Sequence, residues 1–281
     1  MLSATLLALA AAVLHAGWNL IAKRSVDPFV ALWGLFVAAG ALALPILAVG
    51  TAVGAGPSPA AWVWASVTGL VHVPYIVLLG RAYTAGDFSM AYPVARGGGA
   101  LVATIGGVVV LGDRLAGWEL AAIAVAVVGM SMLAVGAARN QVLVAVVVAV
   151  TVGTYTTIDS HAVRTSGGGL YVFAVYLMAA LGISGAGLVL GKGPLLVESV
   201  RTSSGRIVLA AAMSVLTYGL VLIAVRSAPV GYVAALRESS VLIAALVGSR
   251  VLGEGHGRVR AAGAGLIVVG LVLLTAVSTS R

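Results

Sequence analysis

The second half of this chain repeats the first half at a constant offset of 141 residues. Residues 110–113, Val-Leu-Gly-Asp, align with residues 251–254, Val-Leu-Gly-Glu, and Arg96 aligns with Arg237. Each copy has room for five membrane-spanning helices, which is an odd number, so two consecutive copies would enter the bilayer from opposite faces. The repeat therefore predicts an inverted-repeat architecture, which is typical of transporters that expose one site alternately to the two sides of a membrane.

The composition limits the chain to a membrane protein built almost entirely of helices. Of its 281 residues, 61% are hydrophobic and only 9% are charged, whereas a soluble domain carries about 25% charged residues. The absence of cysteine excludes disulfides, iron–sulfur clusters and thiolate zinc sites. We find no catalytic or nucleotide-binding motif and no dense acidic cluster, so we expect no metal and no cofactor. The net charge of +8 is scattered over the ends of apolar blocks, which argues against a nucleic-acid partner.

Ten apolar blocks are long enough to cross a bilayer, which takes about 20 residues. They form an all-α polytopic fold of two inverted five-helix repeats, at 1–137 and 141–281. The longer polar segment from Gly191 to Gly205 is predicted to be a loop. The ten predicted spans are 2–22, 29–50, 60–81, 88–111, 117–137, 141–161, 169–190, 206–226, 229–251 and 259–278.

The distribution of basic residues predicts the orientation in the cytoplasmic (inner) membrane. Apart from Arg96 and Arg237, which lie inside spans, ten Lys and Arg residues follow odd-numbered spans and four follow even-numbered ones. Because cytoplasmic loops are enriched in Lys and Arg, the odd-numbered loops are predicted to be cytoplasmic and both termini outside.

Two arginines are the most informative polar residues inside the spans. Arg96 lies about 12 Å into the fourth span at 1.5 Å per residue, and Arg237 lies equally deep in the ninth. Burying a guanidinium at mid-bilayer costs at least ~2.5–3.5 kcal/mol, so each must face a cavity or a partner. One interpretation is a pair of fixed positive charges for an anionic or zwitterionic substrate. The alternative is structural, with Glu238 or Asp159 as a partner of each arginine.

Further polar and aromatic residues fall on shared helix faces. His15, Trp18 and Asn19 follow helical spacing on the first span, while Tyr75 and Tyr92 lie on stripes of the third and fourth. These residues either line one hydrated cavity, and so contact substrate, or form hydrogen bonds between helices.

Three consecutive glycines follow Arg96 in the fourth span, at 97–99. Glycine weakens a helix by roughly 1 kcal/mol relative to alanine. Either this span is locally irregular where it lines a cavity, or a neighbouring helix packs unusually close to it.

Four motifs are spread over nearly the whole chain, namely His15-Ala16-Gly17-Trp18-Asn19, Tyr92-Pro93-Val94-Ala95-Arg96, Leu111-Gly112-Asp113-Arg114 and Ala234-Ala235-Leu236-Arg237-Glu238-Ser239. Together they resemble the EamA-like family of the drug/metabolite transporter superfamily, in a bacterial branch with a "HAxWN" start. It implies two five-helix EamA-type repeats and movement of small metabolites by alternating access. It also implies that both termini lie inside, whereas the charge count, which we follow, places them outside.

The sequence thus predicts a secondary transporter of a small polar metabolite, anionic or amino-acid-like. Arg96 and Arg237 would anchor negative groups; His15, Trp18, Asn19, Tyr75, Tyr92 and Glu238 would contact the substrate; and Asp159 or Glu238 would carry a proton if transport is proton-coupled. The alternatives are a membrane-embedded enzyme acting on a lipid-linked substrate and a structural or regulatory membrane partner. The expected partners are the substrate and the bilayer, and the sequence does not indicate an oligomeric state.

Overall fold

The computed structural model describes residues 2–85, 87–114, 117–166, 169–237, 239–250 and 257–278, and within them the regular structure consists of α-helices. The helices are α1 (Leu2–Lys23), α2 (Pro28–Ala52), α3 (Pro59–Ala85), α4 (Phe88–Leu111), α5 (Gly117–Leu133), α6 (Arg139–Thr165), α7 (Tyr171–Val189), α8 (Gly193–Ala224), α9 (Val230–Arg237), α10 (Ser239–Arg250) and α11 (Gly257–Ser278).

Seven of the described helices are long and apolar enough to cross a membrane, namely α1 to α4 and α6 to α8. Hydrocarbon supplies no hydrogen-bond partner for the backbone, so a spanning segment must satisfy its own N–H and C=O groups as a helix. The chain is therefore a multi-pass membrane protein. The predicted ninth span corresponds to two described helices, α9 and α10, on either side of position 238, which lies outside the described residues together with 251–256.

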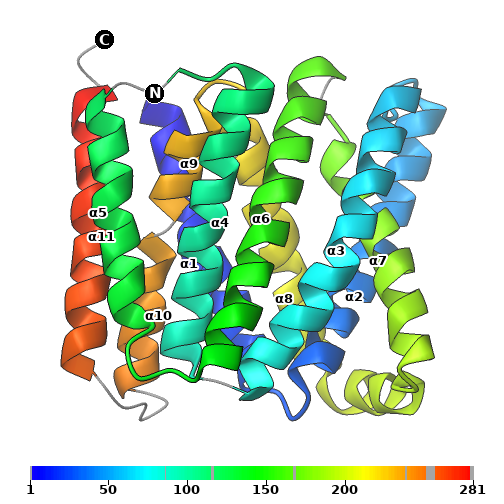
Figure 1. Cartoon of the computed structure of the whole chain (residues 1–281). Helices are drawn as coiled ribbons and strands as arrows, with labels where there is room; N and C mark the ends of the chain where they lie inside the picture. The colour runs from blue at the N-terminus through cyan, green and yellow to red at the C-terminus, as the bar shows by residue number, and fades with distance from the viewer. Residues whose placement is uncertain are drawn as a thin grey trace.

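The predicted loop from Gly191 to Gly205 is wrong, because α8 already begins at Gly193. A non-helical backbone at Ser203 (φ −138°, ψ 24°) divides α8 into two parts. Figure 1 shows the first part, in yellow-green, lying across the lower end of the bundle. Pro194 suits the first turn of a helix because its fixed φ is already helical. The segment carries too many polar residues to span a membrane, but this does not prevent it from forming a helix on the surface.

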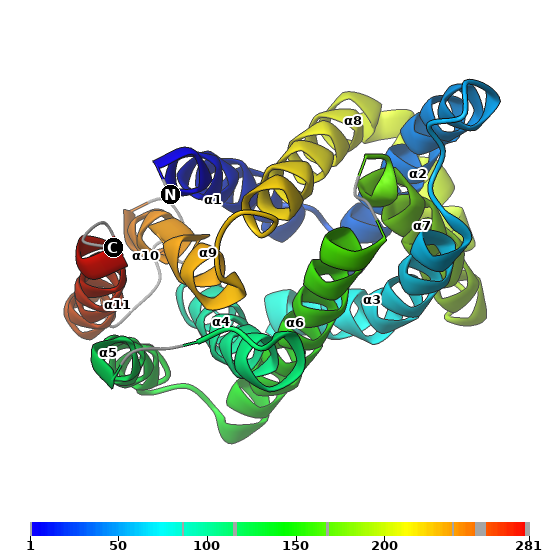
Figure 2. The same ribbon diagram turned by 90° about the horizontal axis from the view of Figure 1, so that it is seen from above.

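The helices stand side by side, and α1 begins at the same end of the bundle where α11 ends (Figure 1). We call this the upper end and the opposite one the lower end. Seen from above, α5 and α11 pair at one side of the molecule and α2 and α7 lie at the other (Figure 2). Between them, α1 packs against α8, α3 against α6, and α4 against α6, α9 and α10. The central helices therefore enclose the middle of the molecule.

The three glycines of α4 permit close helix packing. The helix runs without interruption from Phe88 to Leu111. A Cβ atom added at Gly98 would lie 2.7 Å from Ala149 Cβ, and one at Gly99 would lie 2.6 Å from Val152 Cγ1, both on α6. Of the two predicted explanations, the structure supports close packing, which gives van der Waals contact where the bilayer removes the hydrophobic driving force.

Polar links hold the helix ends together. At the upper end, Arg164 of α6 forms an ion pair with Asp113, which follows α4, at 2.9 Å. Asp113 also accepts a hydrogen bond of 3.0 Å from the backbone N–H of Val230 at the start of α9. At the lower end, Lys23 donates to the carbonyl of Tyr83 at 2.7 Å. These links connect the ends of helices that are distant in the sequence.

A matched pair of glycine substitutions tests the close packing. We expect Gly153→Ala in α6 to lower stability by about 1–3 kcal/mol, because the added Cβ would meet the Cβ of Val102 and lie 2.9 Å from the backbone nitrogen of Ala103. Gly219→Ala in α8 meets no atom within 4 Å and should raise stability by up to about 1 kcal/mol through helix propensity. Thermal unfolding in detergent measures both, and equal effects would contradict the packing argument.

Candidate functional site

A small cavity lies among α1, α2, α3, α6, α7, α8 and the end of α9. Its volume is about 20 Å³, which is room for roughly one water molecule. Ring-bearing side chains dominate its wall, which consists of His15, Trp18, Phe36, His72, Tyr75, Tyr155, Val175, Tyr176, Ser214, Thr217, Tyr218 and Arg237. In this conformation the cavity is too small for a metabolite, so a bound substrate would require the surrounding helices to move apart.

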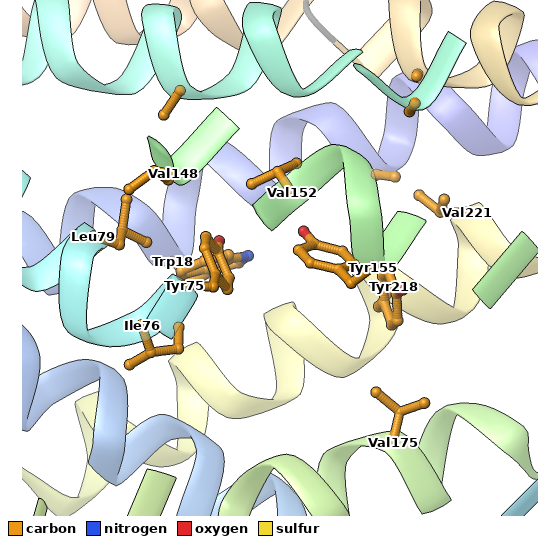
Figure 3. Close-up of a cluster of buried hydrophobic side chains, with 14 of the residues drawn as sticks. Trp18, Tyr75, Ile76, Leu79, Val148, Val152, Tyr155, Val175, Tyr218 and Val221 are labelled. Atoms are coloured by element: carbon orange, nitrogen blue, oxygen red, sulfur yellow. The ribbon is translucent and has the colours of Figure 1, made fainter. Parts of the chain in front are cut away.

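Rings of the cavity wall contact one another across three helices, α3, α6 and α8. The ring centroid of Tyr155 on α6 lies 4.5 Å from that of His72 and 5.4 Å from that of Tyr75, both on α3. It also lies 5.9 Å from the ring of Tyr218 on α8. Figure 3 shows Tyr75 and Trp18 on one side of this cluster and Tyr155 and Tyr218 on the other. Such edge and tilted arrangements are favourable for aromatic pairs and fix the position of each ring.

The two predicted arginines are both buried in this region. Arg237, the last residue of α9, lines the cavity and its relative exposure is 2%. Arg96 on α4 is 5% exposed and is not among the lining residues. Both guanidinium groups act electrostatically on the side chains of His15 and Tyr75. Coulomb interactions are strong in a medium of low dielectric constant, so both arginines influence the electrostatics of the cavity.

His15 and Trp18 present polar atoms that no other described group satisfies. They lie one turn apart on α1 with ring centroids separated by 4.7 Å. Neither Nε2 of His15 nor Nε1 of Trp18 has a hydrogen-bond partner in the described part of the chain, although both atoms are buried. An unsatisfied buried polar atom costs roughly 1–3 kcal/mol. Both side chains line the cavity, so these atoms are available to a polar ligand.

Asn19 and Tyr92 lie near the cavity without lining it. The amide of Asn19 donates to the carbonyl of His15 at 2.8 Å and accepts from the hydroxyl of Tyr83 at 2.6 Å. The hydroxyl of Tyr92 donates to Oγ of Ser240 at 2.9 Å, and its ring lies 6.0 Å from that of His15. The structure thus gives Asn19 a link between α1 and α3, and it gives Tyr92 a link between α4 and α10.

Asp159 lies above the cavity as the centre of a hydrogen-bond network. Its side chain is fully buried and accepts hydrogen bonds from the hydroxyls of Thr68, Tyr171 and Tyr218. These donors come from α3, α7 and α8, so one carboxylate connects four helices. Tyr218 also lines the cavity and joins the network to it. These bonds link Asp159 to hydroxyl groups, whereas one interpretation of the sequence paired it with an arginine.

Some residues of the site did not stand out in the sequence. Phe36, Tyr176 and Ser214 line the cavity, and Thr68 and Tyr171 hold Asp159. In the sequence, each of them is an aromatic or hydroxyl residue within a span rich in alanine and valine. This pattern alone does not distinguish a residue that lines a cavity from one that contacts a neighbouring helix.

The predictions about Glu238 and about metal binding can be compared only with the residues that the structure describes. Glu238, predicted as a substrate contact and possible proton carrier, lies outside the described residues. Within the described ranges, no three His, Asp or Glu side chains gather in a way that would hold a metal ion.

Comparisons with known proteins found similar solved structures and one matching family model. A solved crystal structure of a protein is similar over 99% of both chains, with a TM-score of 0.64 and 19% sequence identity, which shows a shared fold alone. In all, 27 chains of solved structures match. No curated protein matches the chain. Residues 139–276 match the family model of the EamA-like transporter family. The second half of the chain is therefore similar to the EamA-like transporter family.

Proposed function

We propose that this protein is a secondary transporter that moves a small metabolite with a negatively charged group across the cytoplasmic membrane by alternating access. The observation that carries the proposal is the position of Arg237, buried to 2% exposure in the wall of the cavity, with Arg96 buried nearby. The match of residues 139–276 to a transporter family supports movement of a substrate rather than a chemical reaction. An anionic or amino-acid-like metabolite fits this charge.

The guanidinium groups supply both affinity and selection by charge. A guanidinium presents donors in a planar fork that matches a carboxylate or phosphate. A hydrogen bond to a charged group contributes about 1.5–3 kcal/mol, and a cationic molecule would instead be repelled. In the proposed complex, Arg237 binds the anionic group and Arg96 adds to the local positive potential. The unsatisfied Nε1 of Trp18 and Nε2 of His15 belong to side chains that line the same cavity, and in the proposed complex they provide further polar contacts.

The remaining predicted residues take supporting roles in this proposal. The Tyr75 ring forms part of the wall, while Asn19 and Tyr92 hold α1 and α4 in place through hydrogen bonds to Tyr83 and Ser240. A contact between Glu238 and the substrate, and proton transfer by Asp159 or Glu238, stay predictions.

We further propose that residues 1–137 and 141–281 form two inverted five-helix repeats. The offset of 141 residues pairs α1 with α6, α2 with α7, α3 with α8, α4 with α9 and α10, and α5 with α11. If each helix is replaced by its counterpart in the other half, the contact of α1 with α8 becomes a contact of α6 with α3. In the same way, the contact of α2 with α8 becomes one of α7 with α3. All four contacts occur in the structure. The self-paired contacts, α2 with α7 and α5 with α11, also occur. This exchange symmetry supports an inverted repeat.

A ligand screen on purified protein tests the charge selection. Succinate, methylphosphonate, L-alanine and tetramethylammonium represent dianionic, phosphonate, zwitterionic and cationic chemistry. We expect at least one of the first three to raise the unfolding temperature and tetramethylammonium to have no effect. A ligand present at 100 times its Kd adds about 2.7 kcal/mol to stability. Arg237→Ala should remove the response, and proteoliposome uptake of the same compound should fall roughly 10- to 100-fold, as loss of a charged hydrogen bond implies.

The matched control for this screen is Arg139→Ala. Arg139 begins α6 at an exposed position far from the cavity wall. Its replacement should leave both the thermal response and uptake unchanged. If Arg237→Ala and Arg139→Ala behave alike in a folded protein, Arg237 does not bind the anion.

Reporter fusions test the proposed orientation. A C-terminal alkaline phosphatase, which is active only outside the cytoplasm, should be active, and a C-terminal green fluorescent protein should be dark. This expectation follows from the ten Lys and Arg residues after odd-numbered spans against four after even-numbered ones. Cytoplasmic fluorescence without phosphatase activity would reverse the orientation without affecting the proposed site.

A further inference from the structure

A second cavity, here called the vestibule, opens at the lower end of the bundle. Its volume is about 280 Å³, and it lies between the end of α1, the start of α2 and the first half of α8. Its wall includes Trp18, Val30, Ser203 and Ile207. Trp18 lines the central cavity as well. The buried indole of Trp18 is therefore a shared wall that separates the vestibule from the central cavity.

The Asp159 network borders the central cavity through Tyr218, at the upper part of α6. Three hydroxyl groups, from Thr68, Tyr171 and Tyr218, donate to this carboxylate from α3, α7 and α8. The pair of Arg164 with Asp113 adds a second link at the upper end. The cavity thus has the ring of Trp18 toward the vestibule on one side, and hydrogen bonds that hold helices together on the other.

Trp18 and Asp159 are equivalent positions of the two halves. The offset of 141 residues places Trp18 of α1 on Asp159 of α6. The same offset places Val30, which lines the vestibule beside Trp18, on Tyr171, which binds Asp159. It also relates α8, the helix across the vestibule, to α3, which supplies Thr68. Corresponding parts of the two repeats therefore lie at opposite sides of one cavity.

We propose that Trp18 and Asp159 are the two gates of the substrate path, Trp18 toward the vestibule and Asp159 toward the upper end. This inference rests on the proposed alternating access but not on the charge of the substrate. Opening the lower gate requires the indole to move away from the central cavity, and no hydrogen bond of its Nε1 to a described group has to break. Opening the upper gate requires Asp159 to give up its three donors. Without substrate, the upper gate therefore stays closed more firmly than the lower one.

The kink of α8 at Ser203 is a position where the wall of the vestibule next to the lower gate can bend. Ser203 interrupts the helical backbone and lines the vestibule. Residues of α8 beyond the kink continue to the central cavity, where Thr217 and Tyr218 form part of the wall. A rotation at Ser203 would change the vestibule without changing the hydrogen bond between Tyr218 and Asp159.

The absence of cysteine makes a direct accessibility experiment possible in the natural background. A single Thr217→Cys substitution places a thiol in the wall of the central cavity, at a position with 2% exposure. A membrane-impermeant methanethiosulfonate is added to one face of oriented proteoliposomes, and the rate of modification is measured. Arg201→Cys at the lower end and Ala60→Cys at the upper end, both exposed, report which face the reagent reaches.

Removing the indole should open the lower path. We expect Trp18→Ala to raise the modification rate of the cavity thiol at least tenfold from the lower face and to leave the rate from the upper face unchanged. Trp18→Phe keeps a ring of similar shape and should leave the rate close to that of the parent protein. Trp62→Ala removes a partly exposed Trp that lines neither cavity, so it should have no effect.

Weakening the Asp159 network should open the upper path. Asp159→Asn is expected to raise the modification rate at least tenfold from the upper face only. Tyr171→Phe removes one of the three donors, so it should raise that rate by a smaller factor and remains informative if the first variant does not fold. Tyr232→Phe is the matched control, because it also removes a hydroxyl bonded between helices, to Thr5 at 2.7 Å, away from the cavity.

The gate assignment is overturned if folded Trp18→Ala leaves the lower-face rate unchanged or raises both rates equally. It is also overturned if Tyr171→Phe and Tyr232→Phe have the same effect. These rates need no substrate. The gates could therefore be correct while the ligand screen with Arg237→Ala fails, and the two outcomes remain distinguishable.

Discussion

The structure depends on the absence of water in the hydrocarbon core of a bilayer. Every backbone and side-chain polar group placed there must find a partner within the protein or face a cavity. The backbone meets this constraint by forming helices, and Asp159 meets it with three hydroxyl donors. His15 and Trp18 leave one nitrogen each without a described partner, and both line the central cavity. In our account, these two nitrogen atoms form hydrogen bonds with a bound substrate.

Close packing is the second requirement, and glycine provides it. Gly98 and Gly99 let α4 approach α6 so closely that an added methyl group would meet its side chains. The same contact brings Arg96 of α4 and Tyr155 of α6 to the region of the cavity. The small residues that dominate the composition therefore hold the large ring-bearing and charged ones in place.

Much of the fold follows from the sequence because hydrophobic length is a strong signal. The ends of α1, α2 and α4 agree with the predicted spans to within two residues. The sequence did not predict the first part of α8, because a polar surface helix lacks the long apolar stretch by which spanning helices are recognised. At the site, His15, Trp18 and Tyr75, which the sequence placed on helical stripes, line one cavity together with Arg237.

The links made by Asn19 and Asp159 were not predictable in this way. Both depend on contacts between helices that are far apart in the chain, with Tyr83 for Asn19 and with Thr68 for Asp159. A single sequence reveals which face of a helix a residue occupies but not which helix it meets.

The most direct measurement of the central claim, one cavity that opens alternately at two ends, is a pair of distances between spin labels. Arg24→Cys with Arg201→Cys spans the lower end, and Ala60→Cys with Thr165→Cys spans the equivalent positions at the upper end; all four residues are exposed. Pulsed electron paramagnetic resonance should show that a stabilising ligand shifts the two distance distributions in opposite directions. Distances that lengthen together, or that do not change, would contradict alternating access.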